Sequence, residues 1–110
     1  MSENIPTIDP ADAFFALGHA VRWQAVRMMA NGEAVSASDV ARSLGRDFDG
    51  VSKHLRVLRE AGVAASKSAE HDGRLELFYI PESFRPQPGV VDYGFCRLTF
   101  PGGAELVPRR

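Results

Sequence analysis

The apolar residues change their spacing at Gly62, and this change restricts the fold more than any other feature of the sequence. Before it, residues 49–62 carry apolar side chains three and four positions apart, which is the spacing of an amphipathic helix. After it, residues 63–69 and 75–80 show period-two strand patterning on either side of a turn at residues 71–74, which is typical of a β-hairpin. We therefore expect a helical part followed directly by two antiparallel strands.

Three further helices are predicted upstream, and each has recognisable ends. The first covers about residues 10–17 and the second covers residues 19–31. A third helix begins after a cap at Ser36 or Ser38 and ends at Gly45. The residues expected to face the core from these three helices are Phe14, Leu17, Val21, Ala25, Met28, Met29, Val40, Ala41 and Leu44.

Residues 41–51 fit a helix-turn-helix, in which two helices cross closely through a tight turn. Ala41 is small enough for close approach, Gly45 can adopt a positive φ without a Cβ clash, and Val51 fills the space between the helices. Because the hairpin follows the second helix directly, the order is that of a winged helix-turn-helix. The predicted fold class is α+β and mostly helical, with a β-hairpin wing and an additional C-terminal β-strand.

The 110 residues are enough for one compact domain. We expect a flexible N-terminal arm over residues 1–8, the winged helix-turn-helix over residues 9–81, and a Pro-rich connection with a C-terminal strand over residues 82–110. The strand is predicted from the β-like run at residues 90–100. It can extend the sheet of the wing, or it can pair with its copy in a second subunit and bury Val91, Tyr93 and Phe95.

Composition limits where the chain can act and what it can bind. No apolar run approaches the roughly 20 residues needed to cross a bilayer, and the first residues lack the features of a secretory signal, so we expect a cytoplasmic protein. The net charge of -1 gives no overall attraction to nucleic acid. Residues 42–59, however, hold five Lys or Arg against two acidic residues, so any contact with phosphate is expected to be local.

Two segments resemble the ArsR-type bacterial transcriptional regulators. Residues 51–63 have the sequence VSKHLRVLREAGV and resemble the DNA-reading helix of that family, which leads into the wing. Residues 17–22 have the sequence LGHAVR and resemble the opening of the family's second helix. The resemblance covers roughly residues 13–80, with Ala20 at a position where proline is common. It implies a sequence-specific regulator that binds double-stranded DNA, with repression by a homodimer as the default mode.

The resemblance also implies which residues contact DNA, with the helix at residues 49–61 in the major groove. The candidates for contacts to base edges are Gly50, Ser52, Lys53 and His54. The candidates for contacts to the DNA backbone are Arg46, Arg56, Arg59 and Lys67, and Arg74 at the tip of the wing is a candidate for the adjacent minor groove. The alternative, a solvated polar helix face without DNA function, stays open at this stage.

The sequence predicts neither a metal site nor a cofactor. Many ArsR proteins sense metals through a Cys-x-Cys pair, but both positions are serine here, at Ser36 and Ser38, and hydroxyls are poor ligands for soft metals. The three histidines, His19, His54 and His71, are expected to lie far apart. The single cysteine, Cys96, is expected to be a small buried hydrophobic residue, with a redox-sensing thiol as the alternative.

No motif for catalysis is present, since the sequence has no recognisable Ser/His/Asp or Cys/His arrangement and no phosphate-binding glycine loop, so we do not expect an enzyme. The serious alternative to a DNA-binding regulator is a winged-helix module that binds another protein. The neutral overall charge is compatible with both functions.

Overall fold

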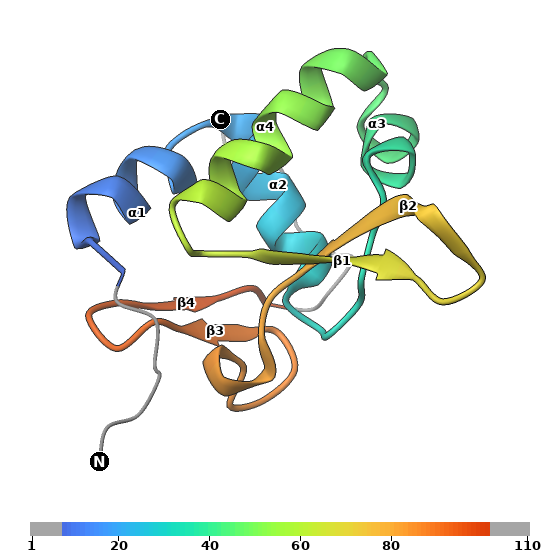
Figure 1. Ribbon diagram of the computed structural model, residues 1–110. Coiled ribbons are helices and arrows are strands. Elements are labelled where there is room, and N and C mark those ends of the chain that lie inside the picture. Colours follow the sequence, from blue (N-terminus) through green and yellow to red (C-terminus); the bar gives the residue numbers. More distant parts are fainter. Residues whose placement is uncertain (1–7, 102–110) are drawn as a thin grey trace.

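The computed structural model describes residues 8–101, which fold into a helical part, a projecting hairpin and a second, shorter hairpin (Figure 1). The helices are α1 (Pro10–Leu17), α2 (Ala20–Met29), α3 (Ala37–Leu44), α4 (Phe48–Glu60) and the short 3-10 helix η1 (Glu82–Phe84). The strands are β1 (Ala65–Ala69), β2 (Asp72–Tyr79), β3 (Val90–Asp92) and β4 (Arg97–Thr99). The predicted fold class is confirmed. The predicted arm over residues 1–8 lies outside the described residues except for Ile8.

Side-chain caps place the helix ends close to where the sequence predicts them. Ser36, and not Ser38, caps α3: its Oγ accepts a hydrogen bond from the Asp39 N–H at 3.1 Å, while the Asp39 carboxylate accepts from the Ser36 N–H at 3.0 Å. Gly45 ends α3 in the left-handed conformation, with φ of 66°, as the turn of the helix-turn-helix requires. Asp47 then caps α4.

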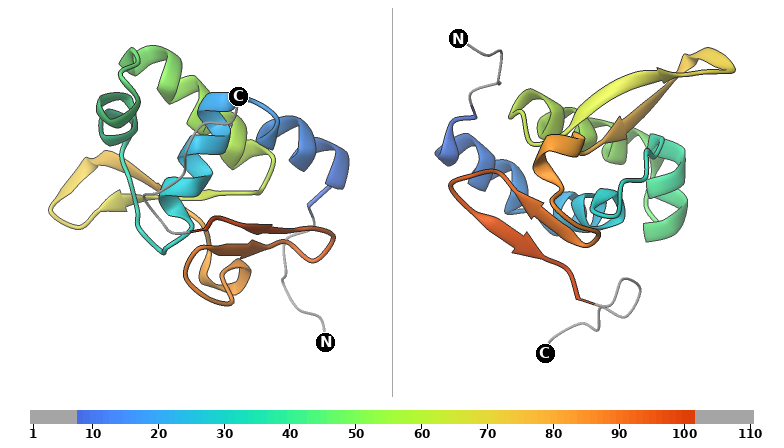
Figure 2. Two further views of the ribbon diagram at one scale, coloured as in Figure 1. Left: turned by 180° about the vertical axis from the view of Figure 1, so that it is seen from behind. Right: turned by 90° about the horizontal axis from the view of Figure 1, so that it is seen from below.

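The wing is formed by β1 and β2, which pair antiparallel with Ala65 opposite Tyr79. Figure 2 shows this hairpin projecting from the body of the molecule, with β3 and β4 as a separate layer against the helices. Strand β2 buries Phe78, and Ile80 just beyond the strand is buried too. Phe78 also exchanges two backbone hydrogen bonds with Val35, the residue before the α3 cap, at 2.9 and 2.7 Å. This pairing ties the base of the wing to the start of the helix-turn-helix.

The core lies between the four helices and the inner side of both hairpins. Its largest fully buried side chains are Met29, Leu55, Leu58, Ile80, Val26, Val40, Val51, Val63 and Val91. Most of the predicted core residues are buried, and Met28 and Leu44 pack against the core while partly buried. The prediction for Phe14 is wrong, because its side chain is 53% exposed. Small alanines, Ala13 and Ala16, form the buried stripe of α1 together with Leu17, so Phe14 falls outside that stripe.

The segment predicted as one C-terminal strand is a hairpin, in which β3 pairs antiparallel with β4. Gly94, with φ of 98°, lies in the turn that reverses the chain direction. Val91 and Tyr93 are buried within this chain's own core, so no second subunit is needed to bury them. The alternative in which the segment extends the sheet of the wing is wrong, because β3 and β4 form a separate sheet. Cys96 in the same turn is half-buried, and burial, together with the nearby Asp92 carboxylate, raises the pKa of its thiol. A raised pKa lowers the thiolate fraction and so disfavours the redox alternative.

Tyr93 fixes this hairpin to the end of α4, because its buried hydroxyl donates a hydrogen bond to the Val63 carbonyl at 2.8 Å. We expect Tyr93→Phe to lower the free energy of unfolding by about 1–2 kcal/mol, since a buried carbonyl loses its donor. Urea unfolding monitored by circular dichroism measures this change. The control is Tyr79→Phe, which removes a hydroxyl that makes no hydrogen bond among the described residues and is expected to change stability by less than about 0.5 kcal/mol. Equal effects of the two substitutions would contradict the role of this hydrogen bond.

Candidate nucleic-acid interface

Helix α4 has one buried side and one exposed side. Val51, Leu55 and Leu58 are buried against the other helices. Lys53 and Arg56 are exposed on the opposite side, as their spacing on a helix predicts. The Arg56 guanidinium donates a hydrogen bond to the Ser52 Oγ at 3.1 Å, one turn earlier on the same helix. The outward side of α4 therefore carries two cations that no acidic side chain within residues 8–101 neutralises.

The first turn of α4 is organised by its cap. The Asp47 carboxylate accepts a hydrogen bond from the Gly50 N–H at 2.8 Å, and a Cβ added to Gly50 would lie 3.1 Å from the Asp47 Oδ1. Gly50 therefore leaves room for the capping carboxylate. The sequence predicted a contact from this residue to a base edge, and the structure shows that it also has a role in the cap. Arg46, immediately before the cap, is exposed, and its backbone N–H bonds to the Ala41 carbonyl at 2.9 Å. Arg46 lines a pocket together with Ala20, Val21 and Gln24 of α2, so it lies on the α2 side of the turn.

Arg59 connects α4 to the wing. Its guanidinium forms an ion pair with the Glu76 carboxylate on β2, donates to the Ser66 Oγ on β1 at 3.3 Å, and lies 5.9 Å above the Phe78 ring. These contacts fix the angle between α4 and both strands of the wing. They also occupy the group that the resemblance assigns to a DNA phosphate, so an Arg59 contact to DNA would have to share or replace them.

His54 points to the inner side of α4 and not to the exposed side. Its Nδ1 lies 3.0 Å from the Arg22 Nη1 on α2, and its ring lies 4.2 Å, centroid to centroid, from that of His19. The expectation that the histidines lie far apart is therefore wrong for His19 and His54, because the crossing of α2 and α4 brings them together. Burial lowers the pKa of the His54 imidazole, and the nearby positive groups lower it further.

The wing carries the two remaining candidates. Arg74 is on β2 near the tip of the wing, with its side chain 96% exposed and its Nε 3.8 Å from the Asp72 Oδ1. The turn between the strands covers residues 70 and 71, and not residues 71–74 as predicted. Lys67 on β1 extends across the sheet, with its Nζ 5.0 Å above the Tyr79 ring. Arg74 can therefore move freely toward a ligand, whereas the Lys67 stem is held along the strand. We call the exposed cations Arg46, Lys53, Arg56 and Arg74 the basic face.

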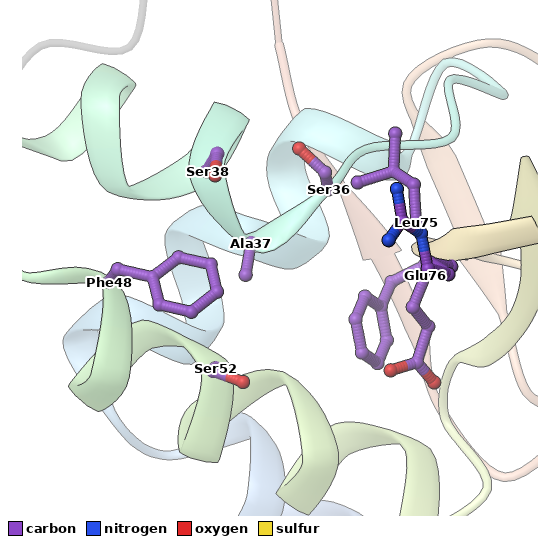
Figure 3. A pocket seen from close by; sticks show the side chains of 9 residues that line it. Ser36, Ala37, Ser38, Phe48, Ser52, Leu75 and Glu76 are labelled. Atoms are coloured by element: carbon purple, nitrogen blue, oxygen red, sulfur yellow. The ribbon is translucent and has the colours of Figure 1, made fainter. Parts of the chain in front are cut away.

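A pocket of about 200 Å³ separates α4 from the wing. Figure 3 shows Phe48 and Ser52 of α4 on one side of this space, the start of α3 above, and Leu75 and Glu76 of β2 on the other side. Ser36 and Ser38, the two serines of the predicted α3 cap, also line it. The Ser36 hydroxyl is engaged in the α3 cap, and residues 8–101 contain no group of three or more His, Cys, Asp or Glu side chains arranged to hold a metal ion.

Three contacts that shape this region have no signal in the local sequence pattern. They are the bond between Arg22 and His54, the ion pair between Arg59 and Glu76, and the pairing of Val35 with Phe78. Each joins elements that are separate along the chain. Arg22 stands inside the segment that resembles the ArsR second-helix opening, and this was the one available hint that it has a specific role.

Comparisons with known proteins agree with this architecture. No protein-family model matches the sequence. The adhesin competence repressor (AdcR) from Streptococcus pyogenes superposes with a TM-score of 0.54 at 17% identity, over 59% of this chain and 47% of that chain. A mutant of ZitR from Lactococcus lactis superposes with a TM-score of 0.51 at 23% identity, over 59% of this chain and 44% of that chain. Together with the order of helices and strands, these likenesses establish a winged helix-turn-helix fold.

One curated sequence is similar over most of the chain. A putative aminodehydroquinate synthase from Amycolatopsis mediterranei (strain S699) is 34% identical over 97 residues, a match that takes in 83% of this chain but 26% of that protein. The chain therefore spans about a quarter of the length of this curated relative.

The helices within residues 8–101 are too short or too polar for any of them to span a membrane.

Proposed function

We propose that this chain is a cytoplasmic, sequence-specific regulator of transcription that binds double-stranded DNA and acts as a repressor. The observation that carries the proposal is the basic face, in which Lys53 and Arg56 are exposed on the outward side of α4. Arg46 in the turn before α4 and Arg74 on the wing are exposed too. In a winged helix-turn-helix such a helix fits the major groove, where its N-terminal side chains can reach base edges. No metal or cofactor is part of the proposal.

Local charge supports this function despite the net charge of -1. Several acidic side chains of this region are engaged in caps and ion pairs: Asp47 caps α4, Asp39 pairs with Arg42, and Glu76 pairs with Arg59. Asp49 and Glu60 on α4 are exposed, and Asp72 lies 3.8 Å from Arg74. The cations of the basic face are exposed, so they can release counterions when they meet phosphates. A neutral protein can bind DNA when its free cations are gathered on one surface.

We also propose that the regulator is of the ArsR type without that family's thiolate metal site. The support is the likeness of residues 51–63 and 17–22, which form α4 with the bend into the wing and the start of α2. Serine at positions 36 and 38 leaves no thiolate there. An inducer, if one exists, would therefore have to act through other residues.

A homodimer completes the proposal, because small DNA readers gain affinity and half-site spacing from two-fold symmetry. Phe14 of α1 and Phe95 in the turn between β3 and β4 form an exposed aromatic patch, and this is the surface we assign to the second subunit. Phe14 is 53% exposed and Phe95 38% exposed, and their rings meet edge to face with the centroids 5.7 Å apart. Contact with an identical surface would cover aromatic area that costs free energy when it faces water.

We expect Phe14→Ser to convert the dimer into a monomer, since it removes the more exposed ring of the aromatic patch, which is 53% exposed. Sedimentation velocity at tens of micromolar protein measures the mass. Phe48→Ser is the matched control, because Phe48 is also 53% exposed but lies at the start of α4, so this variant should stay dimeric. If the parent protein itself sediments as a monomer, the proposed homodimer is contradicted.

The test of sequence-specific binding is a selection from a pool of random duplexes with the purified protein. We expect enrichment of one motif with two inverted half-sites about 10 base pairs, or a multiple of that, apart. Sequencing after successive rounds measures the enrichment. A pool that stays random, or that enriches sequences without a common motif, would contradict a sequence-specific regulator.

The second candidate function is a winged-helix module that binds another protein. The observation that favours it is the exposure of two apolar side chains, Phe48 and Leu75, on either side of the pocket between α4 and the wing. A protein-binding module would show no retention on DNA at any salt concentration, and Arg56→Ala would have no DNA affinity to reduce. The synthase activity in the name of the Amycolatopsis relative belongs to that protein, and because the match takes in 26% of it we propose no enzyme activity here.

A further inference from the structure

Three side chains from separate elements meet on the inner side of α4. His54 of α4 lies against His19, which caps α2, with the ring centroids 4.2 Å apart. The Arg22 Nη1 of α2 lies 3.0 Å from the His54 Nδ1. Arg22 is only 7% exposed, although arginine is rarely buried unless its donors are used. The cluster lies behind the basic face and takes no part in the contacts proposed for DNA.

The Arg22 guanidinium is held at its other end by α1. Its Nε donates a hydrogen bond to the Ala16 carbonyl at 2.6 Å, and its Nη2 donates to the Phe15 carbonyl at 3.3 Å. These carbonyls belong to the last turn of α1, where backbone acceptors have no partner within the helix. Arg22 therefore links the end of α1 to His54 through a rigid, planar group. His54 cannot shift along α2 without losing this bond.

The chemistry of the pair fixes the protonation state of His54. Arginine is a donor at every nitrogen, so the His54 Nδ1 must accept, and the ring proton must sit on Nε2. A protonated His54 would have no acceptor for Arg22 and would add a second positive charge 3.0 Å away. The charged groups that face His54 are His19, Arg22, Arg46 and Asp47, and among them only Asp47 favours the protonated ring.

We infer that His54 is a positioning residue for DNA binding: held neutral by Arg22, it fixes α4 against α2, and its protonation releases α4 and weakens the grip on DNA. The inference rests on the proposed function. It assigns to His54 a role different from the base contact that the ArsR resemblance implies. The two roles differ in sign, because a histidine at the DNA surface would gain affinity for phosphate on protonation, whereas a protonated positioning residue lowers affinity.

The first test is DNA affinity against pH. The probe is a duplex obtained from the random-pool selection, titrated by fluorescence anisotropy between about pH 7.5 and about pH 5.5 at constant ionic strength. We expect the parent affinity to fall by about threefold to fivefold over this range, less than an unshifted histidine could give, because the pKa of His54 is lowered. In His54→Asn, whose amide oxygen can accept from Arg22 without titrating, the change should be less than about twofold, with near-parent affinity at neutral pH. Tighter binding of the parent in acid, or an equal fall in His54→Asn, would overturn the inference.

His19 and His71 are the other two histidines of the chain, so they need a control. His19→Asn keeps a side-chain acceptor for the Val21 N–H and removes the His19 charge, and it should retain most of the parent's pH dependence. His71 is present in every variant and cancels in the comparison. A His19→Asn variant that loses the pH dependence while His54→Asn keeps it would transfer the role from His54 to His19 and overturn the inference.

The second test needs no DNA and no variant. The ring nitrogens of His54 in the parent protein, followed by NMR, should show the proton on Nε2 at neutral pH, and the pKa should lie below its ordinary value because burial and nearby cations disfavour the charged ring. A proton on Nδ1, or a pKa at or above the ordinary value, would overturn the inference. If these NMR results hold but no duplex is bound at any pH, the proposed function has failed while the contact between Arg22 and His54 has been verified.

Discussion

Replacement of Lys53 and Arg56 together by alanine is expected to lower the affinity for a specific duplex about a hundredfold, because two contacts from α4 are lost at about 1–1.5 kcal/mol each. Both side chains are exposed and carry no part of the core, so the fold should survive. The dependence of log affinity on log salt should flatten by about one to two. Anisotropy titrations at several salt concentrations measure both quantities.

The matched control for this double variant is Arg97→Ala. Arg97 is 57% exposed on β4, in the hairpin that packs against the other side of the helices, and it pairs with Asp92 at 3.7 Å. Its removal changes the net charge by one unit but leaves the basic face intact, so affinity should change less than about threefold. If Arg97→Ala weakens binding as strongly as the double variant, binding follows net charge and α4 is not the contact surface.

Arg22→Leu is expected to lower the free energy of unfolding by about 2–4 kcal/mol. The substitution keeps an apolar stem but removes three hydrogen bonds, to Ala16, to Phe15 and to His54. Urea unfolding in the absence of DNA measures the loss, and α1 should be among the first parts to lose protection from hydrogen exchange.

The control for Arg22 is Arg42→Leu on α3. The Arg42 side chain is 74% exposed and its ion pair with Asp39 is at the surface, so its loss should cost less than about 1 kcal/mol. Arg22→Lys is a useful intermediate, because lysine keeps the charge but cannot direct donors to three acceptors at once. An Arg22→Leu variant as stable as the parent would show that the buried guanidinium contributes nothing net to folding.

The stability of the parent should also depend on pH through His54. The folded state lowers the pKa of this imidazole, so between the folded value and the unfolded value near 6.5 the unfolded chain binds more protons. The stability that the neutral His54 ring contributes is therefore fully present above the pKa of the unfolded chain. It is lost as the pH falls through the pKa of the folded protein. The same group thus links folding and the proposed DNA binding in one direction, with both weakened by acid.

Local patterns were enough to predict the helices, the turn and the wing. Ser36 caps α3 and Gly45 ends it, and Val51, Leu55 and Leu58 form the buried side of α4, because caps and periodicity act between neighbours in sequence. The exposure of Lys53 and Arg56 on the outward side of α4 followed from the same periodicity. The sequence could therefore predict the fold class and the side of α4 that faces solvent.

Contacts between elements could not be predicted, since they depend on how helices cross. Arg22 and His54 are 32 positions apart, and Arg59 and Glu76 are 17 positions apart. A helical wheel places His54 on α4 but does not show that α2 brings an arginine to it. The single predicted C-terminal strand failed for a related reason, because Val91 and Tyr93 find their burial in the core of the same chain.

Anisotropy titration of the parent protein tests most directly whether α4 reads a DNA sequence. The two probes are the duplex upstream of its own gene and a scrambled duplex of equal composition. Each is titrated at about 50 mM and at about 200 mM salt. We expect the protein to bind the upstream duplex at least about a hundredfold more tightly than the scrambled one, and both affinities should fall steeply at the higher salt concentration. Equal weak binding to both duplexes, or no binding to either, would contradict this expectation.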